Sequence, residues 1–273
     1  MSTAVALLQE SSRLTGTLMA PWCFEAGTGG GEPWWRCTAP AALDHWLEVV
    51  CASDPVGRRP RAVAASFLMG WLAGAVLGPG VALITGCGRA PCLGPERLHV
   101  RRHPDGWVEA TGLAPAALWT AGGDGRCAGC PGAHACHDLA EVRSRFALAA
   151  RGCIEPVVDA LTDLSPLPPR TLRGAMADAA HSGAAVALAA GHRAEAARLW
   201  RTAGAVVDAM EYPRDGVPAP RPRVTAAMDD PACRVVRGTC CLAYRSPSAR
   251  LAAEAGNETR CASCPLRARE TDR

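Results

Sequence analysis

The sequence predicts an α+β protein that is mostly α-helical, with a small antiparallel β element and a cysteine-rich, metal-binding tail at the C-terminal side. Three observations support this prediction: apolar residues recur at helical spacing over much of residues 40–210, one alternating stretch flanks a Pro-Asp-Gly turn, and four cysteines gather beyond a proline-rich stretch. With 273 residues, the chain is long enough to bury a core without needing disulfides.

Helices are expected in five places: at 41–51, from 61 to about 78, at about 137–162, at 170–190 and at 193–211. The second lies in an uncharged run, 62–84, that is as long as a transmembrane helix. Because proline removes a helix hydrogen bond and glycine lowers helix stability, Pro79 and Gly80 interrupt the run. We therefore expect a buried core helix that ends near Gly78, and no integral membrane span.

The clearest β signal is a hairpin at 97–113. Apolar and polar residues alternate on both sides of Pro104-Asp105-Gly106, and the glycine can supply the positive φ that a tight turn needs. This stretch is expected to be the only clear β element. The glycine-rich, tryptophan-containing residues 20–38 are interpreted as a loop. A phosphate-binding loop is not expected there, because the preceding strand and the Lys-Ser/Thr pair after the glycines are lacking.

Composition divides the chain into three parts. Residues 1–212 form a helical body whose first 40 or so residues are loop-rich, residues 213–230 a proline-rich linker, and residues 231–273 a cysteine segment. The opening residues lack the basic start and apolar core of a secretory signal, so the expected location is the cytoplasm, with attachment to a membrane surface left open.

Charge argues against a nucleic-acid partner. The net charge is only +3, and basic and aromatic residues do not alternate in any patch. The arginines are nevertheless concentrated: residues 231–273 hold eight arginines and four acidic residues, a net charge of +4. A basic tail of this kind would attract an acidic protein or an anionic ligand.

Four of the 14 cysteines form a constellation: Cys240 and Cys241 are adjacent, nineteen residues follow, and Cys261 and Cys264 flank a two-residue turn before a proline. In a reducing compartment, clustered cysteines more often bind metal than form disulfides. Adjacent side chains point to opposite faces of an extended chain, so both can reach one cofactor only where the backbone bends. Spacing alone leaves three alternatives: a [2Fe-2S] cluster, an all-cysteine zinc site, or a redox dithiol.

The sequences "CCLAYRSP" and "CASCPLR" resemble the tail of the ferric-siderophore reductase family, the FhuF-like ferrioxamine reductases. The body is similar to that family in the kind and order of its elements, for example in "RAVAASFLMGWLAGAVLGP" and "IEPVVDAL". One departure is the spacing between the cysteine pairs, which is about ten residues in the family and nineteen here.

The resemblance implies that Cys240, Cys241, Cys261 and Cys264 hold a [2Fe-2S] cluster. It implies an oxidoreductase that delivers one electron to a ferric siderophore, of the hydroxamate type, so that Fe(II) is released in the cytoplasm. The implied partners are that siderophore and an electron donor such as a ferredoxin or a flavoprotein. The alternatives are a non-enzymatic, zinc-stabilised binding module and a thiol-disulfide oxidoreductase that uses the C-terminal Cys-x2-Cys.

A second cysteine group is a weaker metal-site candidate. Cys127, Cys130 and Cys136 lie in "RCAGCPGAHACHD", close to two histidines, and this spacing is compatible with a zinc knuckle. Cys87 and Cys92 could contribute to the same site. The alternative interpretation is that these cysteines are scattered in loops.

Overall fold

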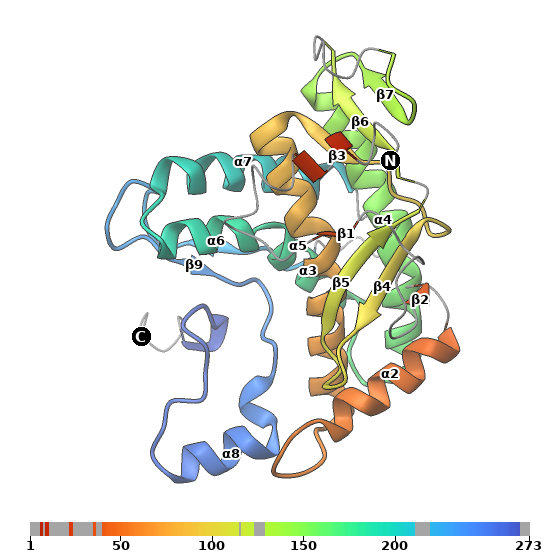
Figure 1. The fold of residues 1–273 in the computed structure, drawn as a ribbon. Coiled ribbons are helices and arrows are strands. Elements are labelled where there is room, and N and C mark those ends of the chain that lie inside the picture. The colour runs from red at the N-terminus through yellow and green to blue at the C-terminus, as the bar shows by residue number, and fades with distance from the viewer. Residues whose placement is uncertain are drawn as a thin grey trace.

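A computed structural model gives the arrangement of the chain (Figure 1). It describes residues 6–7, 9–10, 22–23, 35–36, 40–114, 116–122, 129–210 and 219–267. Most of the loop predicted at 20–38 and residues 213–218 of the predicted linker lie outside the described residues. The described part is mostly helical with small sheets, which confirms the α+β class in outline.

The helices largely follow the predicted pattern. Their bounds are α2 Pro40–Ala52, α3 Arg61–Cys87, α4 Leu139–Leu164, α5 Pro169–Ala180, α6 Ser182–Ala189, α7 Arg193–Ala209 and α8 Pro247–Glu254. The helix expected at 170–190 is two helices, because the chain breaks at His181, whose Nδ1 lies 2.8 Å from the carbonyl oxygen of Ala177. The helix α8 lies in the spacer between the two cysteine pairs and was not predicted.

The prediction that the apolar helix ends near Gly78 was wrong. Helix α3 continues through Pro79 to Cys87 and ends at Gly88, which has a φ of +65°. The proline is tolerated because this part of the helix is packed on all sides: a Cβ placed on Gly80 would lie 1.9 Å from Cζ of Phe146 in α4. Gly80 therefore serves the close packing of α3 on α4 instead of ending the helix.

Helix α3 is the centre of the core. It packs against α2, α4, α5, α6 and α7, and side chains such as Leu68, Met69, Leu77 and Leu83 are buried completely or nearly so. Among the described residues, it is the one helix long and apolar enough to cross a membrane, and 72% of its most apolar stretch is buried inside the protein. This burial accounts for its apolar sequence without a membrane.

The predicted hairpin is confirmed, but it is not the only β element. Strands β4 (Leu98–Arg102) and β5 (Val108–Leu113) pair antiparallel, and Gly106 in the turn has a φ of +93°. The remaining strands have two to four residues, too short to show an alternating pattern. They are β1 Trp22–Cys23, β2 Trp35–Arg36, β3 Arg89–Pro91, β6 Leu118–Ala121, β7 Ala133–Cys136, β8 Arg223–Val224 and β9 Val235–Val236.

These strands form three sheets, ordered β1-β5-β4-β2, β3-β6-β7 and β8-β9. The expectation of an antiparallel element holds for most pairs, whereas β1 pairs with β5 and β6 pairs with β7 in parallel. Strand β8 follows the proline-rich stretch and pairs antiparallel with β9. The cysteine segment continues from β9.

The C-terminal segment, residues 219–267, lies alongside the helices in Figure 1, from α5 and α6 to the loop between α2 and α3. Two parts of this segment pack backbone against backbone: a Cβ on Gly238 would lie 2.6 Å from the carbonyl carbon of Arg221. Only glycine fits at that position, because any side chain would collide with main-chain atoms that cannot move aside.

Candidate metal centre

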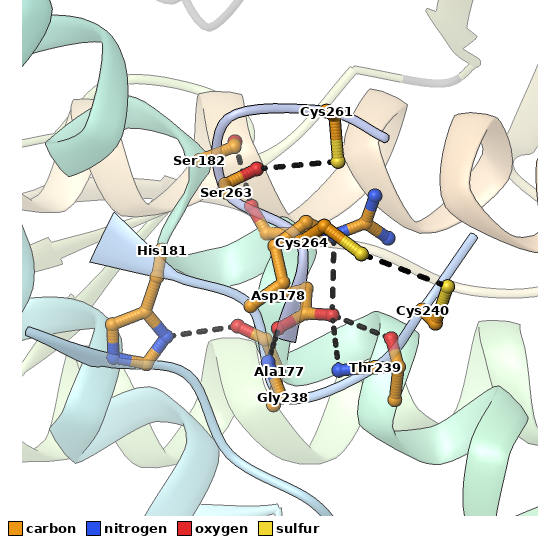
Figure 2. A network of polar contacts seen from close by, with 12 residues as sticks. Ala177, Asp178, His181, Ser182, Gly238, Thr239, Cys240, Cys261, Ser263 and Cys264 are labelled. Atoms are coloured by element: carbon orange, nitrogen blue, oxygen red, sulfur yellow. Dashed lines mark hydrogen bonds and ion pairs between the residues drawn. The ribbon is translucent and has the colours of Figure 1, made fainter. Parts of the chain in front are cut away.

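The structure places the four cysteines of the predicted constellation in two pairs, and Figure 2 shows three of them, Cys240, Cys261 and Cys264. The Sγ atoms of Cys240 and Cys264 are 4.0 Å apart. The thiol of Cys261 hydrogen-bonds to the sulfur of Cys241. Each cysteine of the adjacent pair therefore faces one cysteine of the Cys-x2-Cys turn, so that the thiols form two cross-pairs.

The backbone bends directly after the adjacent cysteines, as the sequence analysis required. Leu242 has φ 58° and ψ 13°, and it is the one non-glycine residue with a positive φ in the described part of the chain. A leucine in this left-handed conformation costs about 1 to 2 kcal/mol. The bend turns the chain into the short 3₁₀ helix η1 (Ala243–Arg245) and lets both sulfurs face the turn at 261–264.

Hydrogen-bond donors surround the sulfur atoms. The backbone N–H of Leu242 donates to Sγ of Cys240 at 3.4 Å, and the N–H of Ala243 donates to Cys241. The Ser263 hydroxyl donates to Sγ of Cys261 at 3.8 Å. Donors of this kind stabilise thiolates, which is the form in which cysteine binds a metal.

The thiols differ in their proton affinity. The hydrogen bond from Cys261, together with the positive charge of Arg237, lowers the pKa of Cys241 to about 6 despite its burial. The pKa of Cys261 is raised, chiefly because its proton is held in that same hydrogen bond. Burial raises the pKa of Cys240. Of these three thiols, Cys241 ionises first.

Access to the four cysteines also differs. Cys264 is buried with 3% of its surface exposed, Cys240 and Cys241 are half-buried, and Cys261 is exposed. The site consequently has an inner side, toward the helical body, and an outer side that solvent or a partner protein reaches through Cys261.

Asp178 of α5 holds the stretch that leads from strand β9 into the cysteines. Its carboxylate accepts hydrogen bonds from the backbone N–H of Gly238 at 2.6 Å and of Thr239 at 3.0 Å, and from the Thr239 hydroxyl at 2.5 Å. Arg237 adds an ion pair at 3.4 Å. Only 8% of Asp178 is exposed, so this carboxylate is a buried anchor whose partners all lie in residues 237–239.

The spacer between the cysteine pairs is folded and docked. Ser246 caps the N-terminus of α8 by accepting a hydrogen bond from the backbone N–H of Ala249. The Ser248 hydroxyl donates to Asp54 at 2.7 Å, and Asp54 is buried in the loop between α2 and α3. The nineteen-residue spacing thus gives the cysteine segment a second attachment to the body, far along the chain from Asp178.

The two pairs of thiols match the ligand count of a two-iron cluster, which takes two thiolates on each iron. One zinc ion with Zn–S bonds of about 2.3 Å draws four sulfurs together around a single point. In the described part of the chain, no three cysteine, histidine, aspartate or glutamate side chains converge closely enough to hold a metal ion. A [2Fe-2S] cluster instead takes two thiolates on each of two separated irons, which matches the cross-pairs.

The second cysteine group is not assembled by the described residues. Cys136 is buried at the end of β7, Cys130 precedes that strand, and the side chain of His137 is 91% exposed and next to Asp138. Cys92 lies 3.7 Å from an arginine nitrogen of Arg97. Cys127 lies outside the described residues, so the second site stays a prediction.

Sequence reasoning did not find the residues that position the cysteines. Asp178 and Asp54 are ordinary acidic residues, 60 and 194 positions from their partners Gly238 and Ser248. No local motif marks such long-range contacts. The sharpest local signal was the adjacency of Cys240 and Cys241, which required a bend but did not show what holds it.

Comparison of the chain with models of known protein families gave no match, and comparison with curated proteins also gave none. The resemblance to the ferric-siderophore reductases therefore rests on the sequence motifs alone.

Proposed function

We propose that this protein is a cytoplasmic iron-sulfur oxidoreductase that reduces ferric siderophores of the hydroxamate type. The observation that carries the proposal is the arrangement of the four cysteines, in which Cys240 faces Cys264 and Cys241 faces Cys261 across a backbone bend. It agrees with the ligand set implied by the resemblance to the FhuF-like reductases.

The chain's own residues would hold and orient the cofactor. The four thiols would be the ligands, Leu242 N–H and the Ser263 hydroxyl donate to their sulfurs, and Asp178 fixes the backbone directly before them. A bound [2Fe-2S] cluster supplies storage for a single electron at a potential tuned by hydrogen bonds and exposure. No general acid, base or nucleophile is needed for this chemistry.

The reaction balances with one donor and one substrate. The Fe(III) of the siderophore accepts one electron that comes from a ferredoxin or a flavoprotein. The three hydroxamate groups take up three protons from water as the weaker Fe(II) complex dissociates, which leaves the free siderophore and Fe(II). Because hard oxygen ligands bind Fe(II) far less well than Fe(III), reduction itself releases the iron.

The exposed arginines of the cysteine segment suit an acidic electron donor. Cys261 is exposed, and Arg234, Arg245, Arg250 and Arg267 of the same segment are exposed as well. A basic surface steers an acidic partner and speeds its encounter. The donor would thus approach the side of Cys261, opposite the helical body.

The two alternative functions receive less support. A thiol-disulfide oxidoreductase that uses Cys261 and Cys264 needs an accessible thiol with a lowered pKa, whereas the pKa of Cys261 is raised and Cys264 is buried. A zinc-stabilised module needs four donors around one point, and the cross-paired arrangement supports that less well than a two-iron centre.

The decisive experiment is a visible absorption spectrum with metal analysis on protein purified without oxygen. We expect a coloured protein with about two irons per chain that dithionite bleaches and a ferric hydroxamate reoxidises. The variant with Cys240 and Cys241 both changed to alanine should lose colour and iron. The matched control is Cys233→Ser, in the same segment, because serine retains the donor to the Ala226 carbonyl oxygen.

A colourless wild-type protein with one zinc ion per chain would overturn the reductase and favour the zinc-stabilised module. A protein that binds neither metal but forms a disulfide reversibly would favour the thiol oxidoreductase.

A further inference from the structure

A cavity of about 580 Å³ lies beside the cysteine cluster, between the helical body and the C-terminal segment. Its wall includes Cys241 and Ser263 from the cysteine segment, Phe67 and Trp71 from α3, and Ser182 and Val186 from α6. This volume is within the range of about 300 to 1,000 Å³ that is usual for small-molecule sites. A ligand in the cavity would therefore touch one of the proposed cluster ligands.

Two glycines of α3 make room for this cavity. Gly70 and Gly74 are one helical turn apart, both line the cavity, and a Cβ added to either would meet no atom within 4 Å. Glycine inside a helix costs about 1 kcal/mol relative to alanine. The rings of Phe67 and Trp71, with centroids 5.7 Å apart, stand beside the glycines and form an apolar, aromatic wall.

The part of the cavity wall that the structure describes offers no free positive charge. The charged residues that line the cavity among the described residues are Asp178 and Arg237, and they form an ion pair with each other. His181 also lines it, and burial lowers the pKa of its imidazole, so the ring is neutral at neutral pH. Arg237 is engaged by Asp178 and leaves no free positive charge in the wall for an anionic ligand, and burying an unpaired charge is costly.

We propose that this cavity binds the organic shell of the ferric chelate and selects chelates without net charge. This inference rests on the proposed function. Three hydroxamates cancel the charge of Fe(III) and leave a neutral complex with aliphatic links, whereas three catecholates leave a charge of −3. The neutral complex matches the apolar wall, in which Arg237 is engaged by Asp178, and its position against Cys241 places its iron beside the proposed cluster ligands.

The test uses gallium(III) complexes, which have the shape of the ferric complexes and take no electron. The gallium(III) complex of a neutral cyclic trihydroxamate is titrated into the purified holoprotein by calorimetry, and the fluorescence of Trp71 and the other tryptophans is followed in parallel. Gallium(III) tris-catecholate is the anionic probe. We expect the neutral probe to bind and the anionic probe to bind more weakly by about tenfold or more.

Gly74→Leu tests the location, because the new side chain projects into the cavity from a position with open space. We expect it to weaken binding of the neutral probe by about tenfold or more. The matched control is Gly152→Leu, on an exposed face of α4 where an added Cβ also meets nothing within 4 Å. Gly70→Leu is the second variant if Gly74→Leu does not fold.

The outcomes separate this inference from the proposed function. Equal binding by wild type and the folded cavity variants, absence of binding by wild type, or equal affinity for both probes would overturn the cavity site. If the protein reduces ferric trihydroxamate and Gly74→Leu reduces it equally well, the reductase stands and the cavity site falls. If the gallium complex binds as expected but the protein holds no cluster, the cavity site stands and the reductase falls.

Discussion

The side chain of Asp178 accepts two hydrogen bonds from Thr239, one from its backbone N–H at 3.0 Å and one from its hydroxyl at 2.5 Å. Together with the bond from Gly238, these contacts connect α5 to the residue that directly precedes Cys240. A buried carboxylate that accepts several hydrogen bonds fixes the backbone that donates them. If that backbone moved, its buried N–H groups would have no partner, which costs about 1 to 3 kcal/mol for each group. Asp178 is therefore a positioning residue for the cysteine site.

Asp178→Asn tests this role. The amide group has one acceptor oxygen where the carboxylate has two, so we expect the free energy of unfolding to fall by about 1 to 3 kcal/mol. The iron content per chain should fall as well, since the backbone before Cys240 loses its anchor. Urea unfolding and iron analysis measure the two effects. Asp163→Asn, at an exposed position of α4, is the control and should change neither. Unchanged iron content in D178N would refute the positioning role.

The contact between Asp54 and Ser248 predicts how firmly the spacer is docked. Ser248→Ala removes the hydroxyl that donates to Asp54 at 2.7 Å, while the cap at Ser246 remains. We expect amide hydrogen exchange in residues 247–254 to accelerate, with a loss of about 1 kcal/mol of stability. Exchange followed by mass spectrometry measures this, and Arg250→Ala, an exposed change in the same helix, is the control. Equal exchange in wild type and S248A would show that other contacts dock α8.

Gly80→Ala adds only one methyl group but should destabilise the protein strongly. Its methyl group would lie 1.9 Å from Phe146 Cζ, so α3 and α4 must separate or the ring must leave its position. We expect a loss of about 1 to 3 kcal/mol by thermal or urea unfolding. Gly152→Ala, in the exposed part of α4, should be neutral or stabilising by up to about 1 kcal/mol, because alanine favours the helix. Similar effects of the two substitutions would contradict the packing of α3 on α4.

His181 predicts a pH dependence of stability. Burial lowers the pKa of its imidazole, and the nearby Arg221 acts in the same direction, whereas the bond to Ala177 and the charges of Asp178 and Asp208 oppose the shift. The unfolded chain therefore binds the proton more readily than the folded protein. The stabilising contribution is complete above the ordinary histidine pKa of about 6.5 and is lost as the pH falls toward the lower folded value.

We accordingly expect the melting temperature to fall between pH 7.5 and pH 5.5, the interval around the ordinary histidine pKa of about 6.5. In His181→Asn the slope over this interval should be smaller, because the titrating group is gone while a donor to the Ala177 carbonyl remains. His192→Asn, at an exposed position, is the control. A slope that H181N leaves unchanged would assign the pH dependence to other groups.

The sequence was most informative where a feature is local. The apolar spacing that predicts α2 and α7, and the Pro-Asp-Gly turn of the hairpin, depend on neighbours within a few residues, and the structure has these elements where they were expected. Pro79 is also a local signal, but tertiary packing overrode it, since α3 is enclosed by other helices on both sides of the proline. The two-residue strands exist only through their pairing and leave no pattern of their own.

The candidate site divides in the same way. The spacing of the four cysteines predicted that they lie near one another, and the structure shows them in two pairs. Their cross-pairing depends on the left-handed backbone of Leu242, a conformation that leucine rarely adopts and that no propensity predicts. The cavity depends on Gly70 and Gly74, which in the sequence are indistinguishable from helix-weakening glycines. Their meaning appears only when the opposite wall, from the C-terminal segment, is in place.

The order of the anchors along the chain has a consequence for biosynthesis. Asp54 and Asp178 both precede the residues that they hold, so the helical body is synthesised before the cysteine segment that docks on it. During synthesis, the residues around Asp54 and Asp178 are therefore present before the cysteines that dock near them. If the protein holds the proposed cluster, delivery of iron and sulfide would accordingly be a late event, which follows folding of the body instead of directing it.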